Sequence, residues 1–116
     1  MKQETHTMTP DNLFADSQMM PVVSDVLEIA AGQNLTRGTL VTATGTACTA
    51  TSGETPTIDD VYAVLAEDVD ATDAAKEAAV YLTGEFNASA VTVAGGEIAD
   101  YKVSARKVGI FIKETI

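Results

Sequence analysis

The sequence predicts an α+β fold that is mostly β: a small β-rich domain with one C-terminal amphipathic helix and an extended N-terminal arm. Three observations lead to this prediction. Short apolar runs rich in β-branched residues alternate with turn signals through most of the chain, which is typical of strands. Near the end, apolar residues recur three and four apart, which is typical of a helix. The opening residues are polar and follow neither period.

The 116 residues are enough for one domain, which we place at residues 21–116, with an arm at residues 1–20. The arm is polar and rich in threonine, and it cannot bury enough apolar surface to offset the entropy lost on ordering. We therefore expect the core of the domain to be independent of the arm, and a partner to order the arm. Its sizeable apolar side chains, which would anchor it on that partner, are Leu13, Phe14, Met19 and Met20. The alternative for these four side chains is a simple cover over the domain's own core.

Within the domain, residues 61–66 (VYAVLA) form the strongest apolar run, and acidic pairs on both sides predict a short buried strand. Threonine alternates with small apolar residues over positions 39–50, which predicts a half-exposed strand with a bulge or hairpin apex at Gly45. Residues 67–77 hold five acids, so we expect a solvated loop or a short helix there. Further strands are predicted at residues 79–82, 90–93 and 110–112.

The C-terminal helix is predicted from a stripe of apolar residues spaced three and four apart, which ends close to a glycine. Gly109 is expected to stop the helix before the last short strand. The stripe should pack against the strands at residues 61–65 and 80–82 to form the core. Its members are Ile98, Tyr101, Ala105, Val108 and Ile112.

Charge and hydropathy exclude several classes of protein. Asp and Glu number 17 against 7 Lys and Arg, for a net charge of -10. This balance argues against a protein that coats nucleic acid and against docking on an anionic membrane, since both need a basic face. No apolar run approaches the ~18 residues that span a bilayer. No apolar stretch follows Lys2, so the chain should begin without a secretory signal.

The sequence also predicts no enzyme and no cofactor. Cys48 and His6 are the single cysteine and histidine, which excludes an internal disulfide, a His-pair metal site and a catalytic triad within the domain. Phosphate-binding glycine loops are absent. A calcium loop at Asp68, Asp70 and Asp73 is the alternative to a solvated acidic run, but it lacks the glycine and glutamate positions of an EF-hand.

Several segments, in order along the chain, resemble the lambda-type head decoration proteins of tailed bacteriophages, also called capsid cement proteins. A polar stretch opens the chain at residues 3–7 (QETHT), and residues 31–40 read AGQNLTRGTL. Residues 61–72 read VYAVLAEDVDAT, and residues 80–87 continue with VYLTGEFN. The closing segment at residues 107–113 reads KVGIFIK. Order and spacing carry the resemblance, because each segment alone is only a strand and a turn.

This resemblance implies a structural virion protein. It implies a compact α+β subunit that binds the major capsid protein on the outer surface of an expanded head, forms homotrimers at three-fold positions and stabilises the shell. The protein would be made in the host cytoplasm. Residues 5–9 are rich in threonine and carry no charged side chain apart from a histidine. This composition would suit the addition of these residues as a strand to a capsid sheet. The expected capsid-binding residues are therefore Thr5, Thr7, Thr9, Leu13, Phe14, Met19 and Met20.

The trimer contact is predicted from the distribution of charge. Residues 101–116 hold four bases and one acid, whereas most acids lie earlier in the chain. A closed ring joins unlike surfaces, so we expect Lys102, Arg106 and Lys107 to lie near a neighbour's Asp68, Asp70 and Asp73. Two alternatives stay open: another virion component, such as a head-fibre base or a tail accessory protein, and a small cytoplasmic enzyme or ligand-binding module.

Overall fold

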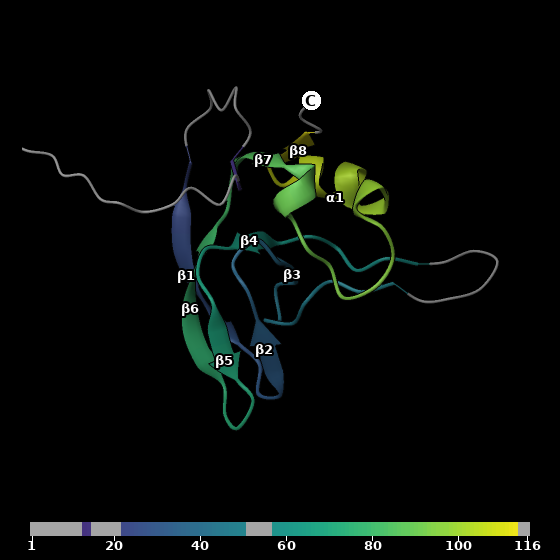
Figure 1. The fold of residues 1–116 in the computed structure, drawn as a ribbon. Coiled ribbons are helices and arrows are strands. Elements are labelled where there is room, and N and C mark those ends of the chain that lie inside the picture. Colours follow the sequence, from purple (N-terminus) through teal and green to yellow (C-terminus); the bar gives the residue numbers. More distant parts are fainter. Residues whose placement is uncertain (1–12, 15–21, 51–56, 114–116) are drawn as a thin grey trace, which may run out of the picture.

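The computed structural model describes residues 13–14, 22–50 and 57–113. In this part of the chain, eight strands accompany one α-helix and two short 3₁₀ helices (Figure 1). The mostly β, α+β fold class is thereby confirmed. The elements are β1 (Ser24–Ile29), β2 (Gln33–Leu35), β3 (Leu40–Val41), β4 (Ala63–Leu65), β5 (Val69–Ala71), β6 (Lys76–Tyr81), β7 (Gly84–Asn87), η1 (Ala88–Ala90), η2 (Ile98–Tyr101), α1 (Lys102–Lys107) and β8 (Ile110–Lys113).

A four-stranded antiparallel sheet in the order β1-β6-β4-β3 forms the centre of the domain. β2 and β5 make an antiparallel pair, and β7 and β8 make a parallel pair. The turn after β3 returns to the end of β1, where the Ala30 N–H donates to the Gly45 carbonyl at 2.9 Å. Gly45 has φ +84°, and a Cβ there would lie 2.1 Å from the Glu28 carbonyl oxygen, so this predicted apex requires glycine.

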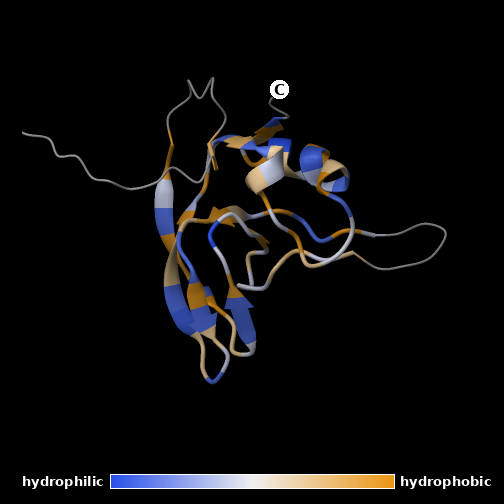
Figure 2. Cartoon of the chain, in the orientation of Figure 1, coloured by the Kyte–Doolittle hydropathy of each residue, from blue (hydrophilic) through white to orange (hydrophobic). Residues whose placement is uncertain are grey.

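Two hydrophobic clusters lie on opposite faces of the central sheet, because successive side chains of a strand point to opposite sides. In β4, Ala63 and Leu65 belong to the cluster that contains β2 and β5 residues, and Val64 belongs to the cluster that contains α1 and β8 residues. All three residues of β4 are buried, as predicted for this run. Figure 2 shows hydrophobic residues at β4 and hydrophilic residues toward the far ends of β2 and β6.

The expectation that the core is independent of residues 1–20 is wrong. Leu13 is 1% exposed and belongs to the larger cluster. Its carbonyl accepts the Asn87 N–H at 2.7 Å. The Phe14 ring stacks on Phe86, with centroids 5.2 Å apart, and meets Tyr81 edge-on at 5.0 Å. A two-residue segment of the predicted arm, far in sequence from Tyr81 and Phe86, thus completes the aromatic packing of the domain, which hydropathy along the chain does not reveal.

The C-terminal helix is shorter than predicted. The stripe is divided between η2, α1 and β8, so Ile112 is a strand residue and Val108 is 38% exposed at the helix end. η2 begins at a capping box in which the Asp100 carboxylate accepts the Glu97 N–H at 3.1 Å. Gly109, with φ +86°, ends the helix as predicted. Tyr101 and Ala105 are buried, as the stripe requires.

Other element predictions need correction. The acidic run at residues 67–77 contains β5 and the start of β6, because Val69 and Ala71 alternate with Asp70 and bury one face. Residues 84–87 form β7, a strand that the sequence analysis did not predict. Residues 90–93 form no named strand; a single bridge joins Thr92 to Thr39, and the Asn87 side chain caps η1 just before.

Candidate functional site

The residues predicted to bind a capsid fall into two groups. Leu13 and Phe14 are already engaged inside the subunit by the contacts given above. In this structure, these two residues connect the start of the chain to the core of the domain. The other five predicted residues lie outside the described part of the chain: Thr5, Thr7, Thr9, Met19 and Met20.

The acidic residues predicted to contact a neighbouring subunit lie around β5 and its turn to β6. Asp68 accepts the Arg37 backbone N–H at 2.8 Å. Asp70 accepts both the hydroxyl and the backbone N–H of Thr72, at 2.5 and 3.1 Å. These two hydrogen bonds lower the pKa of Asp70. All three aspartates, including Asp73, are exposed, so this end of the molecule carries an accessible negative charge.

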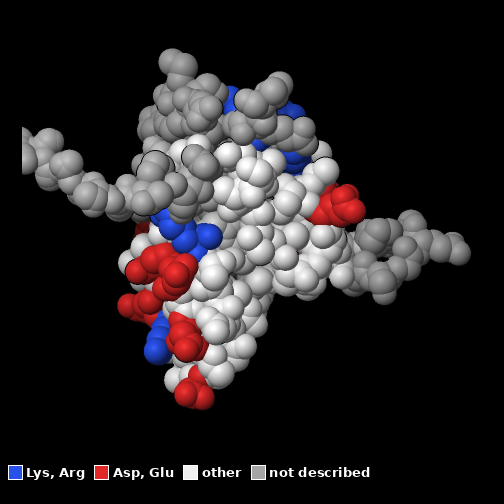
Figure 3. All heavy atoms as spheres, viewed as in Figure 1, with Lys and Arg blue, Asp and Glu red and all other residues white. Residues whose placement is uncertain are grey.

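The basic residues predicted for the same contact lie on α1. Arg106 and Lys107 are exposed on either side of Val103, which is 67% exposed, and Lys102 is half-buried. Figure 3 shows acidic side chains over the β1, β5 and β6 region, with some basic side chains among them, and further basic side chains at the opposite end, near α1 and β8. The structure therefore separates the two predicted sets within one subunit. Any contact between them requires a second subunit.

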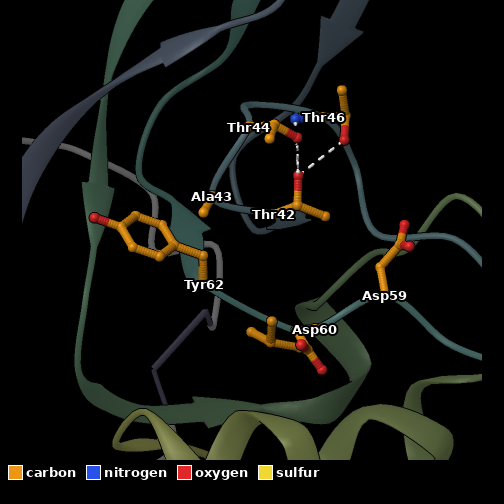
Figure 4. A pocket seen from close by; sticks show the side chains of 8 residues that line it. Thr42, Ala43, Thr44, Thr46, Asp59, Asp60 and Tyr62 are labelled. Carbon is orange, nitrogen blue, oxygen red and sulfur yellow. Dashed lines mark hydrogen bonds between the residues drawn. The ribbon is translucent and has the colours of Figure 1, made fainter.

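A shallow pocket lies between the turn after β3 and the segment that leads into β4 (Figure 4). The Thr42 hydroxyl is hydrogen-bonded to the hydroxyls of Thr44 and Thr46, each at 2.9 Å. Across from them, Asp59 accepts the Thr49 N–H at 3.0 Å. The Tyr62 ring points away from both aspartates (Figure 4). The described lining contains neither histidine nor cysteine.

Metal binding requires several ligating side chains to converge, and thiol chemistry requires an accessible cysteine. Across residues 13–14, 22–50 and 57–113, no three His, Cys, Asp or Glu side chains converge as a metal site would require. Cys48 is fully buried, with Sγ 3.9 Å from the Asp60 carbonyl oxygen. Burial, together with the charges of Asp59 and Asp60, raises the pKa of the Cys48 thiol to about 12. The thiolate needed for nucleophilic attack is thus suppressed at neutral pH.

Arg37 is a structural residue that the sequence analysis did not single out. Its guanidinium donates to the Ala66 carbonyl at 2.8 Å and to the Tyr81 hydroxyl at 2.9 Å. It also lies 5.5 Å from the centroid of the Tyr81 ring, a cation–π distance. Arg37 therefore ties the turn after β2 to β6 beside the Phe14 contact. An arginine in a short Thr-Arg-Gly turn is usually solvated, so the sequence position of Arg37 only weakly indicates this structural role.

These features define a small β-rich structural module whose described surface offers charged ends and an exposed sheet edge. The family model described as Bacteriophage lambda head decoration protein D matches residues 2–108, and the chain belongs to this family. It is therefore a head decoration protein of a bacteriophage, a structural component of the virion capsid. No curated protein matches the chain. Among the described helices, none is long and apolar enough to cross a bilayer.

Proposed function

We propose that this protein binds the outer surface of an expanded phage head as homotrimers and stabilises the shell. The observation that carries the proposal is the family match over residues 2–108, which includes the polar opening segment. The major capsid protein is the partner, and the chemistry is non-enzymatic. A net charge of -10 keeps free subunits apart and soluble until the head offers its sites.

The attachment device in this proposal is the segment before Leu13. Leu13 and Phe14 are held by Asn87, Phe86 and Tyr81, so they fix the point where the preceding residues leave the domain. Thr5, Thr7 and Thr9 would pair as an extended strand with the capsid, and Met19 and Met20 would add apolar contact. Leu13 and Phe14 serve this attachment indirectly, because Leu13 is buried in the subunit's own core and the partly buried Phe14 packs against it.

Subunit contacts would join the two charged ends. Arg106 and Lys107 are exposed at one end, and Asp70 and Asp73 are exposed at the other, as a head-to-tail ring requires. Each exposed pair contributes only about 0–1 kcal/mol. Apolar surface near the three-fold axis must then supply most of the association free energy.

The test is binding of the purified full-length chain to expanded heads that lack decoration. We expect it to sediment with the heads at a copy number close to that of the major capsid subunit, and to raise the temperature at which heads release DNA. Image reconstruction should place three-fold clusters on the outer surface. A copy number far below that of the capsid protein would support a head-fibre base or a tail accessory protein. Failure to bind heads would overturn the proposal.

A further inference from the structure

β1 is the edge strand of the central sheet, and its outer side faces away from every strand that the structure describes. The Leu82 N–H donates to the Val23 carbonyl at 2.6 Å, so Val23 and Leu82 form a hydrogen-bonded pair just beyond the β1–β6 ladder, and the Val23 N–H donates to the Thr83 hydroxyl at 3.1 Å. Such pairs alternate in antiparallel sheets. From the register, Asp25 and Leu27 also direct their N–H and C=O groups toward β6. Ser24, Val26 and Glu28 direct theirs outward.

Apolar side chains accompany this outer edge. Val22, Val23 and Val26 are 38%, 48% and 58% exposed, and together they are half of the large hydrophobic residues exposed in the described chain. Val26 lies opposite Ala79 in the register, and Ser24 lies opposite Tyr81. A second strand laid along β1 would therefore cover valine side chains while it satisfied main-chain groups.

The turn at Gly45 limits the accessible length of the edge at its far end, since the Ala30 N–H donates to the Gly45 carbonyl. Within the remaining stretch, from Val22 to Val26, the Asp25 carboxylate accepts the outward N–H of Val26 at 2.8 Å. This hydrogen bond occupies the Val26 amide in the free subunit, which protects the subunit from edge-to-edge association. A strand added to this stretch would therefore pair with Ser24 and would have to displace the Asp25 carboxylate from Val26.

We propose that the Val22–Val26 edge of β1 accepts an extended strand of the major capsid protein, as a second attachment surface beside the N-terminal arm. This inference rests on the proposed function. Two observations favour the capsid as the occupant. The chain belongs to a family that decorates heads, and the edge directly continues the first 21 residues, so both surfaces can meet the same partner. A second copy is disfavoured, because antiparallel pairing of two β1 edges creates a two-fold dimer, which does not build a three-fold ring.

The first experiment compares two lysine substitutions in the full chain. Val26→Lys places a charge in the proposed contact, and Ala94→Lys places the same charge at an exposed residue outside both β1 and α1. Both sites are solvent-accessible, so both variants should keep the wild-type melting temperature. We expect Val26→Lys to bind undecorated expanded heads about tenfold more weakly than wild type, and Ala94→Lys to bind nearly as wild type.

The second experiment distinguishes strand addition from simple burial of side chains. Site-resolved hydrogen exchange is measured by mass spectrometry on free and head-bound protein. We expect the outward amide of Ser24 to gain protection on heads, and the amides of Asp25 and Leu27, already bonded to β6, to change little. Uniform protection, or none, would overturn the proposal.

The remaining outcomes are also decisive. If wild type binds heads and Val26→Lys binds equally well, the β1 proposal fails while the proposed function stands. If wild type does not bind heads at all, the proposed function itself fails. If wild type self-associates in solution, and Val26→Lys abolishes that association without weakening head binding, the edge belongs to a second copy and the proposal is overturned.

Discussion

Cys48 shows how burial determines the chemistry of one side chain. Its thiol is fully buried, and its pKa rises from 9.0 to about 12 through burial and the nearby charges of Asp59 and Asp60. The folded state therefore retains a proton that the unfolded chain releases above pH 9. By linkage, this group's contribution to stability is complete below pH 9 and is lost as the pH rises toward 12.

The corresponding prediction concerns alkylation by iodoacetamide at pH 8. We expect Cys48 to react slowly in the folded protein and quickly in denaturant, because only the unfolded chain exposes a thiol with an ordinary pKa. Intact-mass measurement over time is the readout. Cys48→Ala is the control: it should not react, and it should cost about 1–2 kcal/mol of stability from lost packing. Rapid labelling of the folded wild type at pH 8 would contradict this account.

At the scale of elements, the segment at Leu13 and Phe14 behaves as a short extra strand beside β7, since Phe14 makes an antiparallel bridge to Phe86. Leu13→Ala should lower the free energy of unfolding by about 2–5 kcal/mol, because it leaves a cavity in the larger cluster. Denaturant unfolding measures this effect. Val22→Ala, at a residue 38% exposed, is the control and should change stability by no more than about 0.5 kcal/mol.

The same element changes the outcome expected for truncation. Removal of residues 2–11 spares Leu13 and Phe14, so the domain should stay folded while binding to heads weakens strongly. Removal of residues 2–18 takes away both core contacts and should also destabilise the domain. An independent core would have tolerated either truncation. Comparison of the two melting curves decides between these views, and equal melting temperatures would restore the independent core.

At the scale of the whole molecule, the separation of acids and bases predicts a charge-swap result. Reversal of Arg106 and Lys107 to Glu should weaken subunit association on heads, and additional reversal of Asp70 and Asp73 to Lys should restore it. Each pair is worth about 0–1 kcal/mol, so the loss should be modest and should shrink at high salt. Cooperativity of head binding is the measurement. A double reversal without rescue would show that these residues do not face one another.

Several parts of this structure could be read from the sequence because they depend on local patterns. Residues 61–66 are apolar and β-branched between acids, and they include buried β4. Gly45 and Gly109 mark a turn and a helix end, because both need positive φ. The order of the segments along the chain indicated the decoration protein family, which the family match confirms.

Other parts depend on contacts between residues distant in sequence. Local composition favours a loop for the acidic run, but the run forms β5 and the start of β6 because β2 and β1 supply partners for them. The stripe at residues 98–112 fits a helix by spacing, but parallel pairing with β7 draws residues 110–113 into β8. The Val22–Val26 edge could not be predicted from the sequence, because the register with β6 determines which amides point outward.

The sequence by itself determined the mostly β fold class, the positions of the strongest strand and of two glycine turns, and the resemblance to phage decoration proteins. Residue type and spacing carry that information directly. Only the tertiary structure decided that Leu13 and Phe14 complete the core, that the aspartates around β5 lie apart from the bases on α1, and that β1 is an edge. The physical reason is that burial, charge separation and strand pairing are properties of residues far apart in the chain, brought together by hydrophobic packing and by main-chain hydrogen bonds.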